Sequence, residues 1–96
     1  MSYSEDQTPP SWTFFSNHGH VLLCLKQSKG MRLREVALKV GITERAVQKI
    51  VKDLETGGVI TKEKVGRCNE YKIQTEVRLR HPVESHRSVG DLLNWV

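Results

Sequence analysis

Two helical runs separated by only three residues constrain the fold of this chain more than any other feature of its sequence. Residues 34–40 place apolar side chains at helical spacing, and Gly41 follows them. Glycine ends a helix readily, because it accepts the left-handed backbone conformation that many helix ends adopt. Thr43 is a suitable N-cap for a second helix over 44–56. We therefore expect a short helix, a tight turn with Ile42 as its apolar residue, and a longer helix.

The longer helix is amphipathic. At about 100° of rotation per residue, its apolar side chains fall on one side. They are Ala46, Val47, Ile50, Val51 and Leu54. Polar side chains gather within roughly 100° of one another on the opposite side. They are Arg45, Gln48, Lys49 and Lys52. We expect the first face to enter the core and the second to be exposed.

A first helix is predicted over residues 17–28, where apolar side chains recur at helical spacing. Either Ser16 or Asn17 can cap it, and Gly30 is a plausible stop. Residues 31–33 are too few for an independent element and fit at most a brief strand. The expected buried stripe of the first helix consists of Val21, Leu22, Cys24 and Leu25.

Two β-like runs, over 59–64 and 69–73, surround a glycine and predict a hairpin. A two-residue turn would place Glu63 opposite Glu70, and like charges in directly opposed positions are unfavourable. A three-residue turn would place Lys64 opposite Glu70 instead. We therefore expect the register with the three-residue turn.

The length of 96 residues suits one domain with short extensions. Residues 1–11 are polar, end in a pair of prolines, and are expected to form a disordered arm. The domain itself is expected over 12–74. Residues 75–96 form a C-terminal extension that is irregular at first, and from Ser88 onward its apolar spacing predicts a short helix.

The net charge of +4 is concentrated in one part of the chain. Residues 31–72 hold ten basic and six acidic side chains, so the excess lies in this segment and the rest sums to zero. An anionic partner is therefore expected to contact the middle segment. The longest apolar run, over 21–25, is far shorter than the roughly 20 residues that span a bilayer. With no basic region at the N-terminus to indicate a signal peptide, we expect a cytoplasmic protein.

Residues 17–73 resemble the small prokaryotic winged helix-turn-helix transcription regulators of the MarR/ArsR-like group. The resemblance is carried by the helices over 34–56, by Gly41 and Thr43 between them, and by the hairpin that follows. It implies a fold that is mainly α with a small β-hairpin wing, that is, a three-helical core plus wing, here with a C-terminal helix. It also implies a DNA-binding regulator of transcription.

The physical properties of the longer helix agree with DNA as the partner. An α-helix fits the major groove of B-DNA, and the residues near its N-terminus commonly reach the base edges. Arg45 and Gln48 are assigned to base reading, because arginine pairs with guanine and glutamine with adenine in bidentate geometry. Thr43 at the helix N-terminus suits a phosphate, and Lys49 and Lys52 are assigned to phosphates.

Further contacts are expected around this helix. Arg32 and Arg34 flank the start of the shorter helix and can touch the DNA backbone. Arg67 at the hairpin tip is the best candidate for the minor groove. The remaining predicted contacts lie on the hairpin and are Lys62, Lys64, Asn69 and Lys72.

Other interpretations stay open. A polar helix face with three cations can be simply solvated, and some winged helices bind proteins or RNA rather than DNA. Cys24 shares a helix face with His20, which fits a metal or sensor site but also a buried cysteine acting as a small hydrophobic residue. Cys68 near the hairpin tip is either a redox-active thiol or an incidental one. The chain has no CxxC, no Gly-rich phosphate loop and no nucleophile motif, so we expect no metal, no cofactor and no enzyme.

The two terminal regions carry more apolar side chains than a small core needs. They either pack on their own chain or form a homodimer interface, which we expect. A homodimer would place two recognition helices about one turn of DNA apart, roughly 34 Å. The residues assigned to this interface are Trp12, Phe14, Phe15, Leu92, Leu93, Trp95 and Val96.

Overall fold

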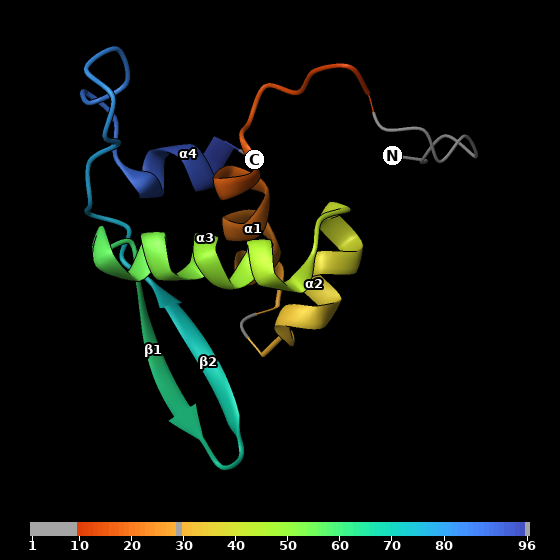
Figure 1. Ribbon diagram of the computed structural model, residues 1–96. Helices are drawn as coiled ribbons and strands as arrows, with labels where there is room; N and C mark the ends of the chain where they lie inside the picture. Colours follow the sequence, from red (N-terminus) through yellow and green to blue (C-terminus); the bar gives the residue numbers. More distant parts are fainter. Residues whose placement is uncertain (1–9, 29, 96) are drawn as a thin grey trace.

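The structure is a computed structural model that describes residues 10–28 and 30–95. Most of the arm expected over 1–11 lies outside the described residues. Val96, which was assigned to the dimer interface, also lies outside them. Three helices are followed by an antiparallel hairpin, an irregular segment and a fourth helix (Figure 1). The elements are α1 (Asn17–Gln27), α2 (Leu33–Val40), α3 (Glu44–Thr56), β1 (Ile60–Val65), β2 (Cys68–Ile73) and α4 (Val89–Trp95). The expected fold class, a mainly α winged helix-turn-helix with a hairpin wing and a C-terminal helix, is confirmed.

The junction of α2 and α3 forms as the sequence predicts. Gly41 ends α2 in the left-handed conformation, with φ of 87°, and its N–H donates to the carbonyl oxygen of Ala37. Thr43 caps α3, because its hydroxyl oxygen accepts a hydrogen bond from the N–H of Ala46 at 3.0 Å. The end of α2 and the start of α3 are therefore both capped within three residues.

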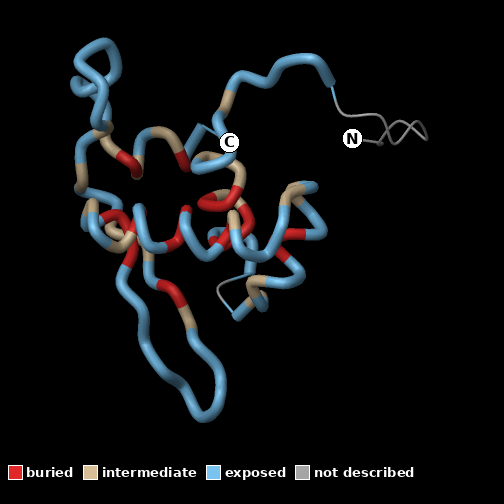
Figure 2. Tube along the Cα trace, viewed as in Figure 1, coloured by how far each residue is buried: buried red, intermediate tan, exposed pale blue. Residues whose placement is uncertain are grey.

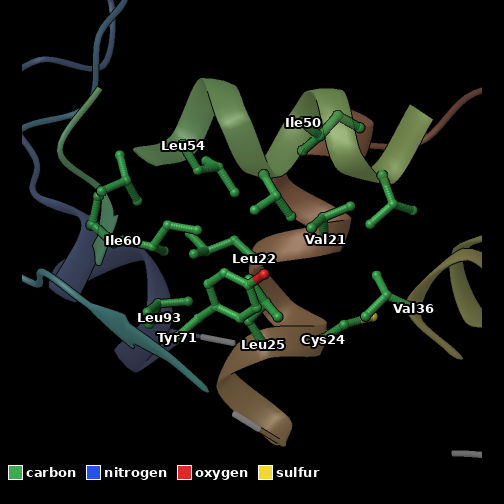
Figure 3. Packing of buried hydrophobic residues seen from close by; sticks show 14 of the residues in the cluster. Val21, Leu22, Cys24, Leu25, Val36, Ile50, Leu54, Ile60, Tyr71 and Leu93 are labelled. Carbon is green, nitrogen blue, oxygen red and sulfur yellow. The ribbon is translucent and has the colours of Figure 1, made fainter. Parts of the chain in front are cut away.

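The core is built around α1. Val21 and Leu25 of α1 are almost completely buried, and side chains from every other element pack in the same cluster (Figure 3). This burial supplies the main stabilising force, since a buried aliphatic side chain contributes about 1.5–3 kcal/mol by leaving water. The surrounding residues include Val36 of α2, Ile50 and Leu54 of α3, Ile60 of β1, Tyr71 of β2 and Leu93 of α4.

The hairpin register differs from our expectation. Val65 pairs with Cys68 across a two-residue turn, and Glu63 lies opposite Glu70. Gly66 opens the turn with a φ of 62°, while no residue other than glycine has a positive φ among the described residues. Glycine at the first central position is typical of the type II′ turn, whose twist matches that of the strands.

Burial explains why this register is preferred. Residues opposite each other in an antiparallel pair share a face, so Ile60, Ile73 and Tyr71 all point to the same side of the hairpin. Ile60 and Tyr71 are buried and Ile73 is half-buried. A slip of one residue would put Ile60 on the opposite face from the other two. The loss of that burial outweighs the repulsion of two glutamates, which costs only about 0.2–1 kcal/mol.

The segment between α1 and α2 also differs from our expectation. Residues 31–33 form no strand, because α2 begins at Leu33 and Arg32 is its N-cap. Leu33 is half-buried against the core, and this contact favours an early helix start. Gly30 is not a left-handed helix stop, because α1 already ends at Gln27, with Ser28 in an extended conformation.

The C-terminal extension packs on its own chain. Val89 and Leu93 of α4 are buried in the core, and the Lys26 ammonium donates to the Leu93 carbonyl oxygen at 2.6 Å. Our assignment of Leu93 to a dimer surface is therefore wrong. The loop before α4 is closed by an antiparallel bridge between Arg78 and Ser88.

The hairpin and this loop project on opposite sides of α3 (Figure 1). Figure 2 shows that both are exposed over most of their length, with burial confined to the base of the hairpin. Within the described part of the chain, no helix is both long and apolar enough to cross a membrane.

Candidate nucleic-acid interface

The outward face of α3 carries the side chains that the sequence assigns to DNA. Val47 and Leu54 anchor the opposite face in the core, and this fixes the orientation of the helix. Thr43 is exposed at the helix N-terminus, where its hydroxyl already caps α3. The predicted residues Arg45, Gln48, Lys49 and Lys52 are all exposed and share the outward face.

The cations on this face are not engaged in ion pairs. Within residues 10–28 and 30–95, the single close contact between a basic and an acidic side chain joins His18 of α1 to Asp53 of α3. Arg45, Lys49 and Lys52 thus point to solvent with their charges uncompensated by a close carboxylate. Such a row of cations on a rigid helix can neutralise phosphates and release their counterions.

The two edges of the outward face differ. On one edge lies Glu55, which faces the base of the hairpin. Burial, and in addition the nearby Glu55 carboxylate, raises the pKa of the Tyr71 phenol. On the other edge lies Asp53, whose carboxylate is 2.9 Å from the imidazole of His18. One edge of α3 is therefore bounded by the hairpin and the other by α1.

The hairpin tip lies beside the start of α2. Arg32, Arg67 and Asn69 line one shallow groove, although Arg32 is far from the other two in the sequence. The structure thus joins the predicted contacts at the start of α2 to those at the hairpin tip. Arg34 is exposed on the first turn of α2.

The hairpin register divides the remaining predicted contacts between two faces. Lys62 and Lys64 lie on the face that carries Asn69. Lys72 lies on the other face, which also carries the acidic residues Glu63 and Glu70. The register therefore makes Lys72 the weakest of the predicted contacts for an anionic partner.

The structure shows the surroundings of the two cysteines and of His20, which were noted in the sequence. Cys24 is buried, and this burial raises the pKa of its thiol, with Lys39 acting in the opposite sense. The His20 ring contacts the side-chain oxygen of Asn17 at 3.3 Å. Cys68 is exposed next to the hairpin turn. Across the described ranges, no three His, Cys, Asp or Glu side chains are grouped to hold a metal ion.

Sequence reasoning missed three residues next to the candidate interface. His18, Asp53 and Arg80 line one shallow cavity beside α3. They come from α1, α3 and the loop after β2, so no local spacing connects them. The one sequence feature that could have drawn attention to them was the position of Asp53, one helical turn after Lys49.

Comparison with known proteins agrees with this geometry. Residues 16–61 match the family described as winged helix-turn-helix DNA-binding. The match covers α1, α2, α3 and the first residues of β1, and most of the hairpin lies beyond it. No curated protein matches the chain. The chain therefore has the winged helix-turn-helix fold, and over residues 16–61 it is similar to the winged helix-turn-helix DNA-binding family.

Proposed function

We propose that this protein is a sequence-specific regulator of transcription that inserts α3 into the major groove of double-stranded DNA. The observation that carries the proposal is the outward face of α3, on which exposed cations and one amide stand without a charged partner from the described residues. The hairpin lies on backbone or minor groove beside it, with Arg67 at the tip. These positions fit a helix in the groove and a wing next to it.

Two kinds of contact are proposed for the face. Arg45 and Gln48 lie in the first half of α3 and read base edges. Lys49 and Lys52, together with Arg32, Arg34 and the exposed cations of the hairpin, contact phosphates. The base contacts set the sequence preference, while the phosphate contacts set affinity and its dependence on salt.

A homodimer is part of this proposal. Exposed aromatic rings support it, since Trp12 is 68% exposed, while Phe14 and Trp95 are each 91% exposed. Trp95 and the half-buried Leu92 line a shallow cavity with Leu79. A two-fold pair of α3 helices would read a two-fold symmetric site. Such a regulator acts in the compartment that holds the DNA, which we take to be the cytoplasm.

Selection from random-sequence duplexes, repeated over a range of salt concentrations, tests the proposal. We expect a defined consensus and an affinity that falls steeply with salt, with a slope near −0.9 per phosphate neutralised. Recovery of no consensus at moderate salt would contradict sequence-specific reading.

Substitution of Arg45 by alanine separates base reading from phosphate binding. Arg45→Ala should weaken binding to the consensus by about 1–3 kcal/mol and relax the preference at one base position. Lys49→Ala is the matched control, because it also removes one exposed cation from α3. It should weaken binding to all duplexes alike and reduce the salt slope by about 1. Equal behaviour of the two variants on every base position would contradict the assigned roles.

A second candidate function is favoured by one observation. The rings of Trp12 and Phe14 stack edge to face, with centroids 5.1 Å apart, and remain exposed. Aromatic residues are enriched at protein interfaces, and tryptophan is a frequent anchor there. A module that docks on a partner protein would bind duplexes weakly and without sequence preference. It would lose its partner when Trp12 and Phe14 are both replaced by alanine, and pull-down with this double variant distinguishes it from the DNA regulator.

A further inference from the structure

A cluster of three charged or titratable side chains borders the outward face of α3. The His18 Nε2 atom is 2.9 Å from Asp53 Oδ2, and the two side chains are 49% and 50% exposed. Arg80 lines the same cavity. Its Nη1 atom lies over the end of α3, 3.1 Å from the position that a Cβ on Gly57 would take. The cluster therefore joins α1, α3 and the loop after β2 at one open site.

The cluster lies on the side of α3 away from the hairpin. With Arg45 set at zero, Lys49 stands at about +40° and Asp53 at about +80° around the helix axis. Glu55, which faces the base of the hairpin, stands at about −80°. The loop that carries Arg80 also projects on the side opposite the hairpin (Figure 1). A duplex whose major groove holds α3 has one backbone strand on each side of the helix.

The charge of the cluster depends on His18. Arg80 stays cationic, and the Asp53 carboxylate offsets it, so the two cancel when the imidazole is neutral. Protonation of the imidazole leaves a net positive charge of one. Histidine is the side chain that ordinarily changes charge between pH 5 and 8. Among the described residues, no other charged or titratable side chain lines this cavity, and Lys49 lies one turn before Asp53 on α3.

We propose that His18, Asp53 and Arg80 form a phosphate-binding site for the DNA strand that borders α3 away from the hairpin, and that His18 takes up a proton when the phosphate binds. Arg80 contacts the phosphate, and the His18 imidazolium compensates the Asp53 carboxylate that would otherwise repel it. This inference rests on the proposed function, because it needs α3 in the major groove. It makes DNA affinity dependent on pH, with tighter binding at the acidic end.

Duplex affinity measured against salt at pH 6 and at pH 8 tests the site, with the full chain and its selected consensus. For the wild-type chain, we expect weaker binding at pH 8 and a salt slope that is steeper at pH 6 by about 0.9, the value for one additional phosphate. His18→Gln should bind at both pH values with the shallower slope. Asp53→Asn should bind more tightly than wild type at pH 8, because the repelling carboxylate is gone.

Matched controls separate this site from other causes of pH dependence. His86→Gln removes a histidine of the exposed loop that does not line the cavity, and should keep the wild-type pH dependence. Arg80→Ala should lose affinity mainly at pH 6, whereas Lys49→Ala should lose it equally at both. Circular dichroism at each pH verifies that every variant is folded.

The outcomes are distinguishable. If the wild-type chain binds no duplex at either pH, the proposed function fails, and this inference fails with it. If it binds its consensus but His18→Gln keeps the wild-type pH dependence, only the phosphate site is overturned. Unchanged affinity of folded Arg80→Ala at pH 6 would overturn it as well.

Discussion

At the scale of single residues, the conformation of Gly41 holds the two helices of the motif in place. Gly41 is left-handed and nothing lies within 4 Å of a Cβ built on it, so a side chain there would meet backbone strain but no steric clash. Gly41→Ala should therefore lower the free energy of unfolding by about 1–2 kcal/mol, measured by chemical denaturation. Gly30→Ala is the matched control, because Gly30 also has open space around it but no positive φ. Equal losses in the two variants would contradict this account.

At the scale of secondary-structure elements, the hairpin register decides whether a charge substitution stabilises or destabilises the fold. In the observed register Glu70 faces Glu63, so Glu70→Lys should turn a repulsion into an attraction and stabilise the fold by about 0.2–1 kcal/mol. In the alternative register Glu70 would face Lys64, and the same change would destabilise it. Chemical denaturation measures the difference. Glu76→Lys provides the same change in net charge at an exposed position after β2. A loss of stability in Glu70→Lys alone would indicate the alternative register.

The cap of α4 includes the carboxylate of Asp91, so the stabilisation that this cap gives to the fold depends on pH. The Ser88 N–H donates to Asp91 Oδ2 at 3.0 Å and, with Arg87 and Arg78 nearby, holds the pKa of Asp91 below that of an ordinary aspartate. Because the pKa of Asp91 is lower in the folded chain, its charge stabilises the fold at pH values above the pKa in the unfolded chain, which is about 3.9. This stabilisation is lost as the pH falls through the lower pKa of the folded chain. Asp91→Asn should thus be less stable than wild type at pH 7.

The gap between wild type and Asp91→Asn should shrink as the pH is lowered toward 3, because protonation removes the charge that the variant lacks. Denaturation curves of both proteins at several pH values measure this gap. The other carboxylates titrate in both proteins, so their effects cancel in the comparison. A gap that is the same at pH 7 and pH 3 would contradict a role for the Asp91 charge.

At the scale of the whole molecule, the exposed aromatic residues predict self-association. Light scattering should give twice the mass of one chain, and Trp95→Ala should weaken the dimer by roughly 2 kcal/mol, about thirtyfold in Kd. Val83→Ala is the control, since Val83 is also largely exposed but lies in the projecting loop. A chain that stays monomeric at micromolar concentration, even with its duplex bound, would contradict the dimer.

Local chemistry in the sequence determined the elements and most of the candidate interface. Helix periodicity placed α3, the preference of threonine for N-caps placed its start at Thr43, and the preference of glycine for left-handed ends placed the end of α2 at Gly41. The same periodicity predicted which side of α3 is exposed, and therefore grouped Arg45, Gln48, Lys49 and Lys52. These features depend on residues within a few positions of one another, so the sequence is sufficient for them.

The tertiary structure alone decided the features that depend on distant contacts. The register of the hairpin followed from the burial of Ile60 and Tyr71 against the helices, and not from the charges across the strands. Leu93 entered the core because α4 folds back on α1. The pairing of His18 with Asp53 joins residues 35 positions apart, and no local pattern connects them. Packing brings such groups together, because the burial of apolar area outweighs the weaker preferences of exposed charges.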